Sequence, residues 1–182
     1  GEDFYFINKL IKGEKFGEII NTYVKPSPRM SNRVPFGTGR AILEAFNNKK
    51  DLSLTYNFKS FEVLKEWVDS IKRERFIYDD FPILIKEYLS REDWKISHKM
   101  FINNSQSNEN YLKLFFKKFD AFWVLKFLHF LRDNHFSNNG LVSSTNRLLL
   151  KSGFETISSA IQQLEFLRIL DKKKGLKAPD YI

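Results

Sequence analysis

Apolar side chains recur at three- and four-residue steps through the middle of the chain, which predicts helices with one buried face. One helix is expected from its N-cap at Ser60 to about Arg75, and Asp80 is expected to cap another. The most apolar helix follows the polar loop of residues 103–110. The expected buried positions of the first and the most apolar helix are Phe61, Leu64, Trp67, Val68, Ile71, Leu112, Phe115, Phe116, Phe119, Phe122, Trp123, Phe127 and Phe130. Residues 59–136 are therefore predicted to form a helical bundle centred on the Phe-rich helix.

Residues 1–58 combine short helical and extended patterns. Apolar positions on one side of residues 3–12 predict a short helix, and residues 18–25 form a β-branched run that two prolines end. A second extended run leads into a Gly-containing turn at residues 37–39 and then into a helix over residues 40–46. We expect a small mixed α/β segment that contains a β-hairpin and is basic in its centre.

Residues 137–182 carry the order of parts that a winged helix needs. In chain order these parts are an extended pair at Leu141 and Val142, a helix over residues 145–152, a break at Gly153, a second helix over residues 155–167, and a hairpin of residues 168–171 and 176–182 around a lysine-rich tip. The expected buried face of the second helix consists of Ile157, Ala160, Ile161, Leu164 and Leu167. The sequence thus predicts two helices joined by a turn and followed by a wing.

The outward face of the second helix in this pair is predicted to be polar. It would present Thr156, Ser158, Ser159, Gln162 and Gln163. In helix-turn-helix proteins the second helix lies in a nucleic-acid groove, where Ser and Gln can bond base edges or phosphates, although more weakly than Arg does. An ordinary solvated face and a protein-binding module remain the alternatives.

The charge of the chain favours a polyanionic partner. The 30 basic and 22 acidic residues give a formal net charge of +8. Two stretches without an acidic residue carry four cations each, residues 19–43 and residues 172–179. Their cations are Lys25, Arg29, Arg33, Arg40, Lys172, Lys173, Lys174 and Lys177. We predict that the three arginines hold phosphate and that Lys172, Lys173 and Lys174 contact the flanking backbone, with Lys177 also binding nucleic acid. Solvated charges or ion pairs are the alternative for the arginines.

The composition excludes several kinds of site. The chain has no cysteine, which excludes disulfides, thiolate metal sites and iron-sulfur clusters. No apolar run approaches the ~20 residues of a membrane span, and we expect a cytoplasmic location. The chain begins with Gly-Glu-Asp rather than with Met, which we interpret as a piece of a longer protein.

Two neighbouring motifs carry a resemblance to a known family. Tyr-Val-Lys-Pro-Ser-Pro-Arg runs from Tyr23 to Arg29, and Arg-Val-Pro-Phe-Gly-Thr-Gly runs from Arg33 to Gly39. Together they resemble the closing part of the catalytic core of archaeo-eukaryotic-type primases and primase-polymerases, where a strand ending in Pro leads to an Arg-hydrophobic-Pro-hydrophobic-Gly turn. In such proteins a helical domain that grips template often follows the core, and winged helices can follow that domain. The resemblance implies a role in replication.

The chain departs from that family in its carboxylates. Primase catalysis needs acidic residues that hold divalent metal, usually an Asp-x-Asp pair with a His further on. This sequence has no Asp-x-Asp, and Glu18 is the only acid near the strand before Pro26. The lack of cysteine also excludes the iron-sulfur domain of the primase large subunit. The resemblance therefore implies a C-terminal region or a non-catalytic relative.

Other catalytic patterns are weak. None of the three histidines, His98, His129 and His135, has the spacing of a metal ligand. The turn at residues 37–39 could hold a phosphate through backbone amides beside Arg40, yet it lacks the Lys of a P-loop. No metal and no cofactor is expected.

These observations predict a mainly α protein with three parts, residues 1–58, 59–136 and 137–182. We expect it to bind DNA without catalysing a reaction and to position template as an accessory or C-terminal region of a primase-like replication protein. A primase or polymerase catalytic domain is an expected partner, and whether the parent protein is an enzyme depends on the rest of it. One alternative is a winged-helix transcription regulator or a plasmid or viral replication initiator that reads duplex DNA. Another is a protein-interaction subunit of a polymerase assembly.

Overall fold

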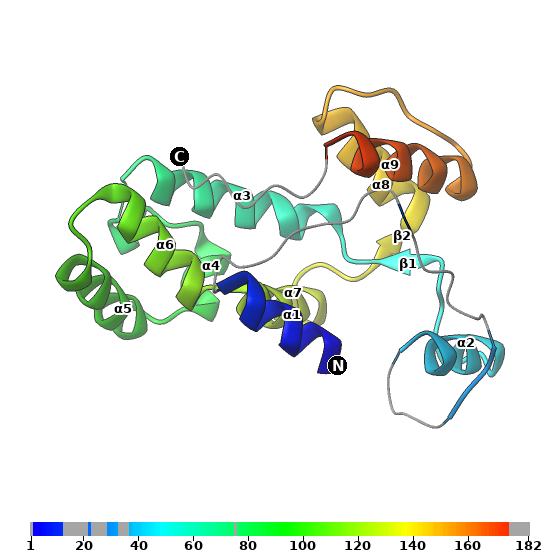
Figure 1. Cartoon of the computed structure of the whole chain (residues 1–182), viewed down its shortest axis with the longest axis horizontal. Coiled ribbons are helices and arrows are strands. Elements are labelled where there is room, and N and C mark those ends of the chain that lie inside the picture. The colour runs from blue at the N-terminus through cyan, green and yellow to red at the C-terminus, as the bar shows by residue number, and fades with distance from the viewer. Residues whose placement is uncertain (1, 13–21, 23–28, 33–36, 75, 175–182) are drawn as a thin grey trace. The chain divides into compact units, whose positions relative to one another are not determined.

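The computed structural model describes residues 2–12, 22, 29–32, 37–74 and 76–174, and helices dominate this part of the chain, as predicted (Figure 1). In chain order the elements are α1 (Glu2–Lys12), α2 (Thr38–Phe46), β1 (Leu54–Thr55), α3 (Phe58–Lys72), the 3₁₀ helix η1 (Tyr78–Asp80), α4 (Ile83–Tyr88), α5 (Arg91–Asn104), α6 (Asn108–Lys118), α7 (Ala121–Asn134), β2 (Asn139–Gly140), α8 (Leu141–Lys151) and α9 (Ala160–Lys174). The two strands pair as a small antiparallel sheet. No helix among these has the length and the apolar content that crossing a bilayer requires.

Two compact units divide the described residues. Residues up to Thr55 and residues from Gly140 onward form one, which we call the terminal unit. Residues 56–139 form the other, which we call the bundle. The strands β1 and β2 lie where the chain passes from one unit to the other. The N-terminal and C-terminal parts of the described chain, which the sequence pattern assigns to separate domains, therefore share one unit.

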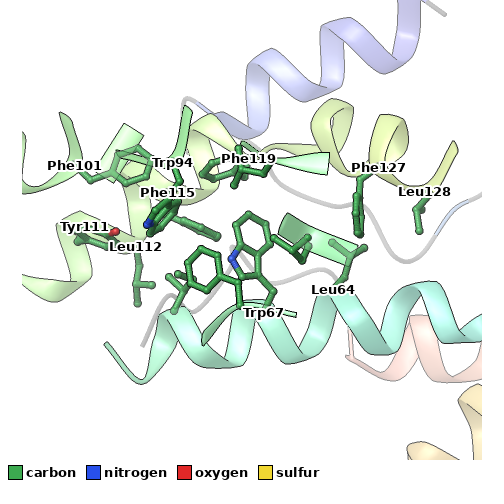
Figure 2. Close-up of a cluster of buried hydrophobic side chains, with 14 of the residues drawn as sticks. Leu64, Trp67, Trp94, Phe101, Tyr111, Leu112, Phe115, Phe119, Phe127 and Leu128 are labelled. Atoms are coloured by element: carbon green, nitrogen blue, oxygen red, sulfur yellow. The ribbon is translucent and has the colours of Figure 1, made fainter. Parts of the chain in front are cut away.

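The bundle is built around Trp67 on α3 (Figure 2). This side chain is 1% exposed, and the rings of Phe81, Phe115, Phe119 and Trp123 have their centres 5.1–5.9 Å from its own. Offset and edge-to-face ring pairs contribute roughly 0.5–1.5 kcal/mol each beyond the area they bury. The Phe-rich segment therefore supplies the core, as its spacing predicts.

Residues that precede the helices fix where the helices of the bundle begin. The side chain of Asn57 accepts a hydrogen bond from the Lys59 amide and caps α3. The prediction that Ser60 caps this helix is wrong, because Ser60 lies inside it and is 1% exposed. The prediction for Asp80 is also wrong. Asp80 belongs to η1, and α4 starts directly after Pro82, whose fixed φ suits a helix start.

The most apolar segment forms two helices rather than the single one predicted. The first ends at Lys118 and the second begins at Ala121. A carboxylate oxygen of Asp120 accepts a hydrogen bond from the Trp123 amide at 2.9 Å, which caps α7 at the break. The apolar spacing continues across this break because α6 and α7 bury their apolar sides in the same core.

In the terminal unit, the two predicted N-terminal helices are present as α1 and α2. The predicted extended runs, and with them the N-terminal β-hairpin, fall almost entirely outside the described residues. Gly39 lies in the first turn of α2, in close contact with the segment before the helix. A Cβ at this position would lie 2.8 Å from Cβ of Ser31 and 3.2 Å from the carbonyl oxygen of Arg29. This close approach explains the glycine and places the backbone of Arg29 beside the start of α2.

The start of the predicted winged helix differs in the structure. Leu141 and Val142 begin α8 and are not extended, so that prediction is wrong. The strand that pairs with β1 is instead Asn139–Gly140. The amide of Leu141 donates a hydrogen bond to the carbonyl of Ser53 at 2.7 Å, so the strand pairing passes directly into the first turn of α8.

The second helix of the pair also differs from its prediction. It begins at Ala160 and continues to Lys174, so residues 168–171 are helical and do not form the first strand of a hairpin. No Gly or Pro interrupts residues 160–174, and their Gln, Leu, Glu, Arg and Lys side chains favour helix. Nothing in the local sequence therefore ends the helix at residue 167. The predicted second strand, residues 176–182, lies outside the described residues.

Candidate nucleic-acid interface

A buried glutamine holds the α8–α9 pair together. Gln163 on α9 is 2% exposed, and its Nε2 lies 2.8–3.0 Å from the carbonyl oxygens of Val142 and Ile157 and from Oδ1 of Asn146. The same Oδ1 accepts a hydrogen bond from the Ile157 amide at 2.8 Å. The buried amide of Gln163 would cost about 1–3 kcal/mol if it were left unpaired. The network therefore fixes the start of α8, the connecting loop and α9 in one arrangement.

The side of α9 that faces the unit is not the side predicted. Ile161 and Leu164 were expected inside, but they are 71% and 48% exposed. The buried and half-buried positions are Gln163, Phe166, Leu167 and Leu170. Among them, Phe166 packs edge-on against Phe154 with ring centres 5.2 Å apart. Because α9 carries apolar residues on both sides, its periodicity does not distinguish them, and the buried bonds of Gln163 decide the orientation.

The predicted groove-facing residues separate into two groups. Thr156, Ser158 and Gln162 are exposed around the start of α9. Ser159 is half-buried, and its carbonyl accepts the hydrogen bond of the Gln163 amide at 2.9 Å. The prediction that Gln163 faces outward is wrong, because its amide is buried and donates hydrogen bonds to α8 and to the connecting loop. The exposed three lie where the first amides of a helix give a partial positive charge.

An open hollow lies beside the start of α9. Its volume is about 1060 Å³, and its polar lining includes Ser143 and Arg147 of α8 and Ser158 before α9. The rest of its lining is largely aliphatic, with Leu52, Leu141 and Leu150 among the residues. None of the described residues that line it is acidic. A guanidinium, two hydroxyls and a helix start without a carboxylate are groups that attract an anion.

The sequence analysis missed Arg147 as a member of the site. The signal was present, because residues 134–154 contain no acidic residue and include both Arg147 and Lys151. The stretch carries only these two cations, whereas residues 19–43 and residues 172–179 carry four each. Ser158 lies in the connection after α8 and lines the same hollow as Arg147. The sequence does not show that these two residues lie close together in space.

The predicted phosphate-binding arginines have different environments. Arg29 is exposed. Nε of Arg40 lies 2.7 Å from Oε1 of Glu44, one turn further along α2, so Arg40 does have an acidic neighbour. Arg40 and Glu44 are half-buried, and a helical ion pair of this spacing is worth only about 0.3–0.5 kcal/mol, which weakens the assignment of Arg40 without blocking it. Arg33 lies outside the described residues.

The predicted lysine cluster lies at the end of a helix and not at the tip of a hairpin. Lys172, Lys173 and Lys174 form the last turn of α9, and Lys172 is exposed. Lysines in this position also stabilise a helix by offsetting its macrodipole, which is the alternative to a phosphate contact. Lys177 lies outside the described residues.

Most titratable groups with shifted pKa values lie in the bundle, and in the terminal unit the side chain and the amide of Ser53 donate hydrogen bonds to Asp51 and lower its pKa. Nδ1 of His98 is 2.7 Å from the hydroxyl of Tyr111, and the His98 ring stacks on Trp94 with ring centres 5.3 Å apart. Burial lowers the pKa of His98 and raises the pKa of Tyr111. The guanidinium of Arg91 donates to both carboxylate oxygens of Asp79 and holds its pKa below the ordinary value. Packing and ion pairing explain these groups, and no three His, Asp or Glu residues of the described ranges gather as a metal site would require.

Comparisons with known proteins add no relative to this picture. No family model matches the chain, and no curated protein and no solved structure matches it. The interpretation of the interface therefore depends on its own geometry and chemistry.

Proposed function

We propose that this chain binds DNA, without a catalytic step of its own, through the hollow beside the start of α9. The observation that carries the proposal is the set of groups that meet there. Arg147, Ser143 and Ser158 come from two segments, and no acidic residue accompanies them among the described lining residues. This is the arrangement that a phosphate group requires.

Two properties of the chain support this function. Guanidinium–phosphate hydrogen bonds are charge-assisted and contribute about 1.5–3 kcal/mol each, more than neutral bonds do. The net charge of +8 raises the local concentration of a polyanion over the whole surface. The hollow would fix where the DNA binds, and the positive charge of the chain would attract the DNA to its surface.

The α8–α9 pair follows a strand, as a winged helix requires, but its connection is long. A helix-turn-helix joins its helices by about three or four residues. Here the connection is residues 152–159, and Gln163 and Asn146 bond its backbone. We therefore propose a winged helix on the order of the elements alone. The long connection does not support placing α9 in a groove as a helix-turn-helix would place it.

The place of this function in replication rests on the motifs between Tyr23 and Gly39. They support a role as an accessory or C-terminal region of a primase-like protein, in which the chain positions template for a catalytic domain. Gly39 and Arg29 lie together beside the start of α2, so the described ends of the two motifs meet in space.

Fluorescence anisotropy with a labelled DNA of mixed sequence tests the proposal on the whole chain. Arg147→Glu should weaken binding about 10- to 100-fold at low salt, because it removes a charge-assisted contact and adds a repelled charge. Lys99→Glu is the matched control, since it makes the same change at an exposed position of α5 in the bundle. Equal affinities of the two variants, with circular dichroism unchanged, would remove the hollow as the DNA site.

Protein binding is the second candidate function, and the surface of α9 favours it. Ile161, Leu164 and Ile169 are 71%, 48% and 51% exposed on the sides of α9 away from its buried face. Exposed apolar patches mark protein interfaces more often than nucleic-acid ones. Ile161→Ala removes apolar surface without adding a charge and should leave DNA affinity unchanged in either case. If Ile161→Ala abolishes activity of a reconstituted polymerase assembly and Arg147→Glu does not, protein binding is the function.

A further inference from the structure

We propose that the hollow beside the start of α9 accepts unpaired nucleotides of single-stranded DNA rather than the backbone of a duplex. This inference rests on the proposed function and specifies the form of DNA that the same site takes. It follows from the apolar part of the hollow and from the outward sides of α9.

The outward sides of α9 are poorly suited to a duplex groove. Reading a major groove requires side chains that hydrogen-bond base edges, and the only apolar target there is the thymine methyl group. The outward sides of α9 include the exposed side chains of Ile161, Leu164, Glu165 and Ile169. A carboxylate is repelled by flanking phosphates, and the aliphatic side chains would lose water without gaining hydrogen bonds. Of the two glutamines expected to face the groove, Gln163 is buried and Gln162 alone is exposed.

The lining of the hollow suits a base that has left its stack. Leu52, Leu141 and Leu150 line it and are 49%, 39% and 59% exposed, so each has apolar surface still to bury. In a duplex the base faces are stacked inside, and the exterior ridges are charged phosphodiesters, which cannot cover leucine side chains favourably. An unpaired base offers an apolar face to such a surface.

One side of α8 carries polar groups followed by an apolar one, an arrangement that suits a phosphate and its base. Ser143, Arg147 and Leu150 are spaced four and three residues apart, which places them on one side of the helix. A phosphate beside Arg147 and Ser143 would therefore leave its base next to Leu150. Ser158 lines the same hollow and adds a hydroxyl to it.

The hollow is open and already formed. Its volume of about 1060 Å³ is at the upper end of the range for small-molecule sites, which suits a segment of a strand better than one small ligand. One part of its lining is fixed by the hydrogen bond from the Leu141 amide to the Ser53 carbonyl, and another by the bonds between Asn146 and Gln163. A preformed surface avoids the ordering cost that flexible binding segments incur.

Competition between strand forms tests the inference on the whole chain. The probe is a single strand of about 16 nucleotides, and the competitors are the same strand unlabelled and its duplex. The single strand should bind at least ~10-fold more tightly than the duplex. Leu150→Ala should weaken single-strand binding about 3- to 10-fold and leave duplex binding unchanged, since it removes apolar surface and no charge. Leu148→Ala is the matched control, because Leu148 is 44% exposed on the same helix and does not line the hollow.

Salt dependence separates failure of this inference from failure of the proposed function. Arg147→Ala should reduce the log–log salt slope of single-strand binding by about 0.7, the value of one phosphate contact. If the duplex binds as tightly as the single strand and Leu150→Ala has no effect, while Arg147→Ala still weakens binding, the strand assignment is wrong and DNA binding at the hollow stands. If neither variant changes binding of either form, both proposals fail.

Discussion

Replacing Trp67 with Phe should destabilise the bundle less than replacing Trp94 with Phe, although both indoles are buried. Trp67 is 1% exposed and Trp94 is 2% exposed. Nε1 of Trp94 donates a hydrogen bond to the carbonyl of Phe76 at 3.0 Å. Nε1 of Trp67 has no hydrogen-bond partner among the residues that the structure describes. The two substitutions thus remove the same atoms, but the indole N–H that is lost is hydrogen-bonded in Trp94 and unpaired in Trp67.

The size of the difference follows from the cost of an unpaired buried group. Both substitutions leave a smaller ring in the core, and this loss is similar in the two variants and largely cancels between them. Trp94→Phe also leaves the Phe76 carbonyl without its donor, at about 1–3 kcal/mol. Trp67→Phe removes a donor that already lacks an acceptor and regains a similar amount. The Trp67 variant is therefore expected to be more stable than the Trp94 variant by about 2 kcal/mol or more.

Urea unfolding measures this difference in the whole chain. All three tryptophans, Trp67, Trp94 and Trp123, lie in the bundle, so the fluorescence of the two that remain follows that unit alone. Far-UV circular dichroism provides a second probe. At a slope of about 1–3 kcal/mol/M, a difference of 2 kcal/mol separates the two midpoints by roughly 1 M urea.

Equal midpoints with equal slopes would refute the reasoning. Equal midpoints would mean that the faces of the surrounding rings accept a hydrogen bond from the Trp67 N–H. The buried N–H would then have no free-energy cost for Trp67→Phe to recover. A changed slope in only one variant would instead indicate a different unfolded or native state, and Trp67→Ala then provides the reference. That variant should lose about 3–5 kcal/mol through the cavity alone.

Two further predictions concern a histidine and a glutamine. Burial lowers the pKa of His98, so the unfolded chain takes up its proton first, and stability should fall as the pH drops below about 6.5 toward the folded-state pKa. The urea midpoint should be lower at pH 5 than at pH 7.5 and His98→Leu should flatten this dependence, whereas a wild-type midpoint that does not change would contradict it. Gln163→Ala should leave the carbonyl of Ile157 without its side-chain donor and remove the additional bond to the carbonyl of Val142, at about 1–3 kcal/mol, and speed amide hydrogen exchange in α8 and α9 with the bundle unchanged. Unaltered exchange in α9 would show that the amide does not hold the pair together.

In the bundle, local sequence was a good guide to buried positions and a weaker one to helix ends. Leu64, Trp67 and Ile71 are buried as their spacing predicts, because a helix with one core contact has a single inward side. Helix ends depend on single hydrogen bonds, such as that of Asn57 to the Lys59 amide, and several nearby Ser, Asn and Asp residues can make them. Apolar periodicity contains no information about which of them does so.

By itself, the sequence determined that the chain is mainly helical, where its apolar stripes lie and that its charge is positive, because these properties depend on composition and on neighbours three or four residues apart. Only the tertiary structure decided which side of α9 is buried. Apolar residues lie on both sides of that helix, and the choice is made by acceptors on α8 and the loop that pair with the Gln163 amide. It also decided that Leu52, Arg147 and Ser158 share one hollow, because contacts between residues distant in the chain depend on how whole elements pack.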